Sequence, residues 1–158
     1  MLVLKQNAIS AWHFTPGRHL TQLYGGPPDP VGPGMRHHCK LSVRLCQRGF
    51  HASPELEHAL LFASVVASKR APEEPLVLSQ VLCWGDVKFS SRYDKLVASD
   101  RQCVRLLEVP EEITRKIRIF MGLGCSKRIA KQIRDLPDYM WEDHPALHWT
   151  PEDGSEVY

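Results

Sequence analysis

The chain has 158 residues, 43% of them hydrophobic, and its 20 Lys and Arg residues nearly balance its 18 Asp and Glu residues. A chain of this length buries roughly two-thirds of its unfolded surface, so one core can form without a disulfide or a metal. The formal net charge of +2 is too small for a general nucleic-acid footprint, and no stretch approaches the ~20 apolar residues of a membrane span. Residues 1–7 lack the apolar core of a secretory signal, and the five cysteines have no paired spacing. The sequence therefore predicts a cytoplasmic protein with free thiols and no membrane contact.

The first predicted element is an aromatic strand over residues 10–14. Side chains alternate along a strand, which places Trp12 and Phe14 on one face and His13 on the other. Residues 24–34 follow, with too many Gly and Pro residues for a helix or strand. This composition predicts an exposed loop.

Two short strands, over residues 41–45 and 50–52, are predicted to lead into a helix from Pro54 to about Ser68. Ser53 is a favourable N-cap residue, and proline suits the first helical position. Apolar residues recur along this helix at the spacing of one buried face. They are Leu56, Ala59, Leu60, Ala63, Val66 and Ala67.

The second half of the chain predicts strands and then helices. Three strands are expected, over 76–84, from Val87, and over 102–109. Two helices are expected after them: one begins at Pro110, and the second is capped by Ser126 and ends before Pro137. Strands, one helix, strands and two helices predict a single α+β domain with a small, mostly antiparallel sheet. We divide it into a core over 1–109 and a helical extension with an acidic tail over 110–158. The expected core residues are Phe50, Ala52, Ala59, Leu60, Ala63, Leu78, Leu82 and Leu106.

Two clusters of reactive residue types are candidates for a metal site or a nucleophile, although each could also be part of ordinary packing. His37, His38 and Cys39 precede Cys46, but this gap is wider than a zinc knuckle and no second compact pair follows, so no metal site is predicted. A nucleophile pair between His51 and either Cys83 or Cys103 is the second candidate. Buried cysteines on apolar strands are usually inert, and the spacing selects neither thiol.

A basic segment over residues 115–134 offers an electrostatic surface. Lys127, Arg128 and Lys131 are its candidate partner-binding residues. Cationic helices of this kind bind phosphates or acidic proteins, although such a face is more often merely solvated. The acidic residues over 135–158 could also neutralise it.

Three blocks, read together, resemble a family of small uncharacterised proteins from bacteriophages and prophages. The blocks lie at residues 11–14, 46–53 and 94–99, with a Gly-Asp pair at 85–86 between the last two. The resemblance covers residues 8–108 and implies no established activity. It does imply a phage origin, and therefore a location in the host cytoplasm.

A fainter similarity is to ADP-ribosyltransferases of the His-Tyr-Glu type. In that family a histidine on an early strand bonds the nicotinamide ribose of NAD, and His13 lies in the corresponding block. The block at residues 49–53 resembles the family's second strand, which implies cofactor contacts from Phe50, His51 and Ser53, with His51 in the place of the stacking tyrosine. The family's glutamate implies Glu108 as a catalytic residue beside His13.

Two functional hypotheses follow from these resemblances and from the basic helices. The first is a phage-encoded, ADP-ribosyltransferase-like domain that binds NAD and modifies a host macromolecule. Glu156 is the rival to Glu108 for completing its site. The alternative is a non-catalytic accessory or anti-defence protein that binds and inhibits a host complex, for example one of the CRISPR type.

Overall fold

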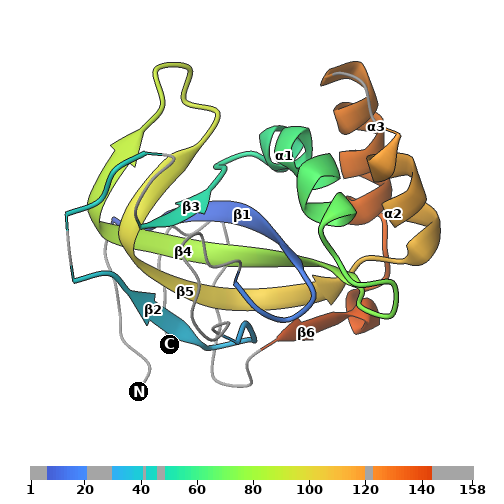
Figure 1. Ribbon diagram of the computed structural model, residues 1–158, viewed down its shortest axis with the longest axis horizontal. Coiled ribbons are helices and arrows are strands. Elements are labelled where there is room, and N and C mark those ends of the chain that lie inside the picture. The colour runs from blue at the N-terminus through green and yellow to red at the C-terminus, as the bar shows by residue number, and fades with distance from the viewer. Residues whose placement is uncertain (1–6, 21–29, 41, 46–48, 120–122, 144–158) are drawn as a thin grey trace.

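The computed structural model describes residues 7–20, 30–40, 42–45, 49–119 and 123–143. It confirms an α+β arrangement with a six-stranded antiparallel sheet and three α-helices (Figure 1). The elements in chain order are β1 (Ile9–Pro16), β2 (Arg36–His38), β3 (Phe50–Ala52), α1 (Leu56–Ser68), β4 (Leu76–Phe89), β5 (Leu96–Glu108), α2 (Glu111–Arg118), α3 (Leu123–Arg134), a 3-10 turn (Asp138–Met140) and β6 (Trp141–Asp143).

Strand β5 organises the sheet, because it has a long partner on one edge and three short ones on the other. Strand β4 pairs along most of one edge and itself carries β1. The second edge takes β3, β2 and β6 in succession along its length. The long apolar runs of β4 and β5 explain why these strands are central, since residues 76–83 of β4 and 96–104 of β5 are buried on both faces.

Two register shifts in the β4–β5 pair bend the sheet on itself. They lie between Gln80 and Val81 and between Trp84 and Val87. Such bulges increase local twist, and Gly85 supplies the second with a left-handed backbone, φ +84°. The bend brings β3 to β1, where Trp12 and the residue after β3 exchange two backbone hydrogen bonds of 2.7 and 2.9 Å. The strands β1, β4, β5 and β3 thus form a closed ring at this point.

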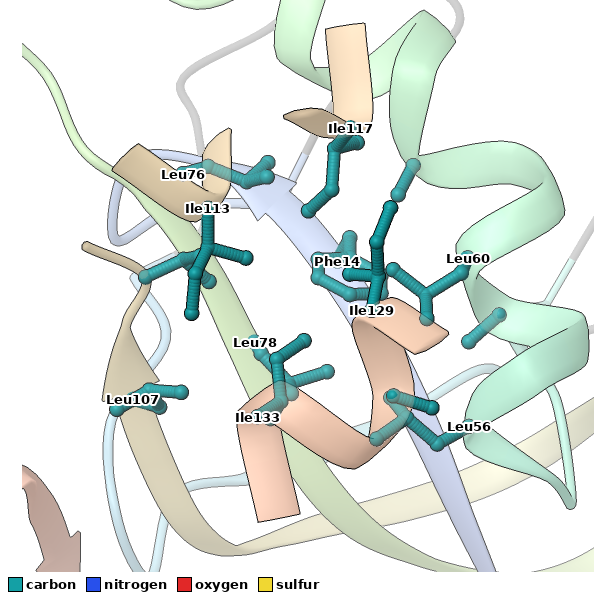
Figure 2. Packing of buried hydrophobic residues seen from close by; sticks show 14 of the residues in the cluster. Phe14, Leu56, Leu60, Leu76, Leu78, Leu107, Ile113, Ile117, Ile129 and Ile133 are labelled. Carbon is teal, nitrogen blue, oxygen red and sulfur yellow. The ribbon is translucent and has the colours of Figure 1, made fainter. Parts of the chain in front are cut away.

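The three helices gather on one outer face of the sheet and form a single apolar cluster with it (Figures 1 and 2). Helix α1 presents the predicted face, because Leu56, Ala59, Leu60, Ala63 and Ala67 are all buried. The alanines at every fourth position let the helix approach the sheet closely. Trp12 and Phe14 contribute from β1 as predicted, and α2 and α3 add their isoleucines.

The expected single core is wrong, because the two faces of the sheet form separate clusters. Ala59, Leu60, Ala63 and Leu78 share the helix-side cluster. Ala52 packs in a second cluster, with Val81 and Cys83 among others, and Leu106 in a third, with Phe50 against it. Leu82 is fully buried. Successive residues of a strand point to opposite faces, so apolar residues from one strand serve two cores.

Several predicted element boundaries differ from the structure. Ser53 does not cap α1: the N-cap position is Glu55, without a side-chain hydrogen bond, and Ser53 instead pairs with β1. Ser126 is likewise not a cap but a buried residue inside α3. The described residues of 41–45 form no strand, whereas the short strand β2 at Arg36–His38 was not predicted.

The strand predictions for β4 and β5 were too short for a common reason. Gly85 and Asp86 were interpreted as a strand end, but they form a bulge inside β4, and the true turn lies over residues 90–95. Tyr93 holds a left-handed conformation there, φ 57°. The predicted strand over 102–109 is therefore only the second half of β5, which begins at Leu96.

The C-terminal helices pack on the rest of the domain through α1. Ile113, Ile117, Ile129 and Ile133 lie in the same cluster as Leu60. Charges at the ends of α2 suit the helix dipole, with two glutamates in its first turn and three basic residues in its last. Within the described residues, no helix is long and apolar enough to cross a membrane.

Candidate functional site

A pocket of about 200 Å³ opens between α1 and the junction of β1 with β3. Its walls come from the aromatic strand β1, from β3 and the residue that follows it, from α1, and from the end of the β4–β5 turn. The lining residues are Trp12, His13, Phe14, His51, Ala52, Ser53, Ala59, Phe62, Val66 and Lys95. A volume below the 300–1,000 Å³ of drug-sized sites suits one ring-sized group.

The local sequence explains why a pocket forms here. Trp12 and Ser53 hold β1 and β3 together by paired backbone hydrogen bonds, but only at this single bridge. The helix that follows β3 is joined by Pro54 and Glu55, so α1 packs over β1 and leaves space above β3. Phe62, 40% exposed, stands at the open side of this space.

The structure brings together His13, His51 and Ser53, three of the residues implied by the family resemblance. Burial lowers the pKa of His13 well below 6.5, with further lowering by Arg101 and by His51. Burial also lowers the pKa of His51, aided by Lys95 and Arg101. Both imidazoles are therefore neutral at pH 7, which suits stacking and hydrogen bonding rather than ion pairing.

Phe50 lies apart from the pocket, although it is next to His51. Alternation along β3 turns its ring to the inner face of the sheet, where it packs against the cluster of Leu106. There the centre of its ring lies 5.5 Å from the centre of the His37 ring and 5.3 Å from Cζ of Arg101. Its role in the structure is to support the inner core beneath the pocket.

Glu108 is also separated from the pocket by the sheet itself. His13 pairs with Ser79, which pairs with Leu106, so Glu108 lies two strands away and further along β5. Its carboxylate accepts a 3.0 Å hydrogen bond from Arg18 Nε, and Arg18 also pairs with Glu142 of β6. The predicted convergence of Glu108 with His13 is therefore not present. The rival residue, Glu156, lies outside the described residues.

Seven of the ten lining residues were not predicted as site residues, Phe62 and Lys95 among them, and neither was Arg101 behind the pocket. Phe62 looked like one more apolar residue of α1. Lys95 lies in the block at residues 94–99; its Nζ lies 5.4 Å from the centre of the Phe62 ring. Asp94 closes the turn instead, accepting from Ser90 Oγ at 2.5 Å.

Arg101 crosses the inside of the strand ring to reach the wall of the pocket. It is only 3% exposed, and its Nη1 donates to the backbone oxygen of His51 at 3.0 Å. Its register partners on the same face are Cys83 and His37. Alternation places the arginine inward, and its reach to the His51 carbonyl depends on the pairing of β3 with β5, which the sequence did not reveal.

The other described cysteines and histidines of the candidate clusters are buried or hydrogen-bonded to neighbouring groups. Burial raises the pKa of Cys83 to about 12 and that of Cys103 to about 11, so neither thiol is an activated nucleophile. His38 Nδ1 lies 2.8 Å from Asp100 Oδ1, and His37 Nε2 lies 3.1 Å from the backbone oxygen of Pro30. No group of three or more metal-ligating side chains occurs in the described part of the chain, and Cys46 lies outside it.

The basic helices carry a partly neutralised surface. Lys131 Nζ pairs with Asp135 at 2.7 Å, and Arg128 Nη2 lies 3.8 Å from Cys125 Sγ. Lys127 lines a groove between α3 and the start of α1 that also contains Glu55 and Glu57. A second hollow, on α2, is lined by Glu112, Arg115, Lys116, Arg118 and Ile119.

The chain was compared with protein-family models, with curated proteins and with solved structures, and none of them matches it. The function is therefore argued from the pocket and the surface alone.

Proposed function

We propose that this domain binds NAD and holds its nicotinamide ring in the pocket between α1, β1 and β3. The carrying observation is that His13 of β1, with His51 of β3 and Ser53 directly after β3, lines one ring-sized pocket with aromatic walls. The neutral His51 imidazole can stack on the ring, and its nitrogens can donate hydrogen bonds to the carboxamide or accept them from it. Lys95 at the same pocket offers a cation for the phosphates outside it.

The proposal is limited to binding, because transfer of ADP-ribose needs stabilisation of a developing oxocarbenium ion. A carboxylate is the group that the resemblance implies for this task. None of the described residues that line the pocket is acidic, and Glu108 is held by Arg18 on another part of the sheet. A domain of this kind would carry NAD or sense it.

Calorimetric titration with NAD, up to millimolar concentration, tests the proposal. We expect saturable binding to the wild type and a loss of at least about tenfold in affinity for His51→Ala, since the ring loses its stacking partner. Glu108→Gln is the matched control and should bind as the wild type does. No heat of binding in a folded wild-type sample would refute the proposal.

A second candidate function is supported by the exposed side chains of α2. Ile119 is 77% exposed and shares a hollow with Arg115, Lys116 and Arg118. An apolar residue beside three cations and one acid, Glu112, suits an acidic protein surface, so we infer that this side binds and blocks a host protein.

A pull-down from bacterial extract separates this function from NAD binding. The variants are a triple reversal of Arg115, Lys116 and Arg118 to Glu, which changes the cations of this hollow, and His51→Ala. A protein retained by the wild type and by His51→Ala, but lost with the triple reversal, supports blocking through the helices. Loss only with His51→Ala would return function to the pocket.

A further inference from the structure

A histidine, an aspartate and an arginine meet where β2 pairs with β5, and none of them lines the pocket. His38 is opposite Asp100 in the register, and its Nδ1 lies 2.8 Å from Oδ1 of that carboxylate. Arg36 is two residues earlier on β2, so its side chain points to the same face of the sheet. Its Nη2 lies 3.6 Å from the same Oδ1 atom. The imidazole and the guanidinium therefore come together at one carboxylate oxygen.

The carboxylate of Asp100 is fixed from its other side. It is buried, and its Oδ2 accepts a 3.0 Å hydrogen bond from Ser99 Oγ. Ser99 Oγ in turn accepts a 2.9 Å hydrogen bond from the backbone N–H of Asp86. Gly85 leaves room for this chain of hydrogen bonds, because a Cβ there would lie 2.6 Å from Asp100 Oδ2. A buried carboxylate with both oxygens engaged is a rigid partner for His38.

The contact with Asp100 determines which nitrogen of His38 is reactive. A carboxylate accepts hydrogen bonds and does not donate them, so the proton belongs to Nδ1, and Nε2 of the neutral ring keeps its lone pair. The His38 side chain is 55% exposed, which makes Nε2 accessible to a ligand. The Ser99 hydroxyl is bonded to the opposite oxygen of Asp100, so His38 does not activate it. The imidazole itself is therefore the nucleophile of this group.

Arg36 indicates what kind of group this nucleophile receives. The Arg36 side chain is exposed, and its Cζ lies 5.1 Å from the centre of the Trp84 ring, which holds the guanidinium beside His38. A guanidinium matches the oxygens of a phosphoryl group, whereas an acyl or alkyl group has no anionic oxygens for it to bind. Asp100 supplies the negative charge for the imidazolium that forms when Nε2 gains a substituent.

We propose that His38 accepts a phosphoryl group on Nε2 from a small phosphoramidate. The Nε2 lone pair forms a bond to phosphorus while the P–N bond of the donor breaks, and the donor's ammonium nitrogen leaves as ammonia. The Nδ1 proton stays in its hydrogen bond to Asp100, and Arg36 binds the phosphoryl oxygens. Donor and product each hold phosphorus through a P–N bond, so the transfer is close to balanced in energy. The inference is independent of NAD binding, which uses other residues.

Incubation of the folded protein with potassium phosphoramidate at pH 7.5 tests the proposal. Phosphorus NMR distinguishes a phosphoryl group on Nε2 from one on Nδ1. We expect His38 to react first among the eight histidines of the chain, with phosphorus on Nε2, and the early signal to be lost in His38→Gln. His37→Gln is the matched control: His37 is the neighbouring histidine, its Nε2 lies 3.1 Å from the backbone oxygen of Pro30, and its loss should leave the early signal unchanged.

Variants of the two partners test the roles assigned to them. Asp100→Asn keeps the shape but removes the charge, and should slow the reaction of His38 by at least about tenfold. Arg36→Gln should slow it by at least about threefold. Arg92→Gln is the control for that change, because Arg92 is an exposed arginine in the turn between β4 and β5, and it should react as the wild type does. Circular dichroism checks that each variant is folded.

Several results would overturn the inference. They are a wild type that takes no phosphoryl group at His38, phosphorus on Nδ1, and an unchanged rate in folded Asp100→Asn. Equal rates for Arg36→Gln and Arg92→Gln would also overturn it, and this comparison uses exposed positions, so it holds even if Asp100→Asn does not fold. Each of these results leaves the proposal of NAD binding untouched.

Discussion

Truncation of Leu60 measures how strongly the sheet depends on the helices that cover it. Leu60 is 1% exposed, and its side chain points from α1 toward Phe14 of β1 and Ile129 of α3 (Figure 2). The change Leu60→Ala removes Cγ, Cδ1 and Cδ2, which at about 0.8 kcal/mol per buried methylene costs about 2.4 kcal/mol. A residual cavity of roughly 40 Å³ adds about 1 kcal/mol at about 24 cal/mol per Å³. We therefore expect a loss of about 3 kcal/mol in the free energy of unfolding.

Urea denaturation followed by circular dichroism at 222 nm gives this free energy directly. Val65→Ala is the control, because Val65 lies on the same helix but is 56% exposed, and it should change stability by less than about 0.5 kcal/mol. The m-value should stay constant in both variants, since the unfolded surface is unchanged. A loss below about 1 kcal/mol for Leu60→Ala, or one equal to that of the control, would refute the packing of three elements around this residue.

Three further outcomes are expected. Gly85→Ala should lower the free energy of unfolding by more than about 2 kcal/mol, because φ is +84° and a Cβ would lie 2.2 Å from the buried Ser99 hydroxyl. Gly124→Ala is the control: its Cβ would point into open space, so the change should raise the free energy of unfolding by about 0.5 kcal/mol. Equal effects of the two changes in urea titrations would contradict this expectation. The pKa values of His13 and His51 in the folded protein lie below 6.5, so the native state binds fewer protons than the unfolded state as the pH falls. The free energy of unfolding should therefore be at its full value above pH 6.5 and should fall at lower pH. This fall should be smaller in His13→Gln, which lacks one of the two imidazoles. Urea midpoints at pH 7.5 and pH 5.5 check the sign. Burial raises the pKa of Cys83 to about 12, so its thiol should resist a disulfide reagent at pH 8 until the protein is unfolded, and rapid labelling in the native state would contradict the assignment.

The fold class followed from the sequence because local signals agreed with the tertiary structure. The face of α1 and the alternation of Trp12 and Phe14 are periodicities that a single segment displays, and both were predicted correctly. The start of α1 was missed because Ser53, a good cap by type, is engaged by a strand 41 positions earlier, Trp12. Local preference yields to pairing where the partner comes from far along the chain.

Only the part of the site that lies in local sequence patterns could be predicted. His13 and His51 lie in recognisable blocks on strands, and the structure places both at one pocket. Their meeting depends on how the bulges bend β4 and β5, and the approach of Lys95 and Arg101 depends on the pairing of β3 with β5. Nothing in the spacing of Gly85 and its neighbours distinguishes such a bulge from a turn.

The closure of the strand ring also fixes when the pocket can come into existence during synthesis. Strand β1 is synthesised early, but its partner β4 begins at Leu76, 60 residues after β1 ends at Pro16. Strand β3 pairs with β5, which is synthesised later still. Long-range pairings of this kind form slowly, because chain closure must precede the contacts that stabilise it. A nascent chain that ends between residues 95 and 98 therefore has every lining side chain of the pocket but not the complete pairing of β3 with β5, so the pocket should form only after this part of β5 has been made.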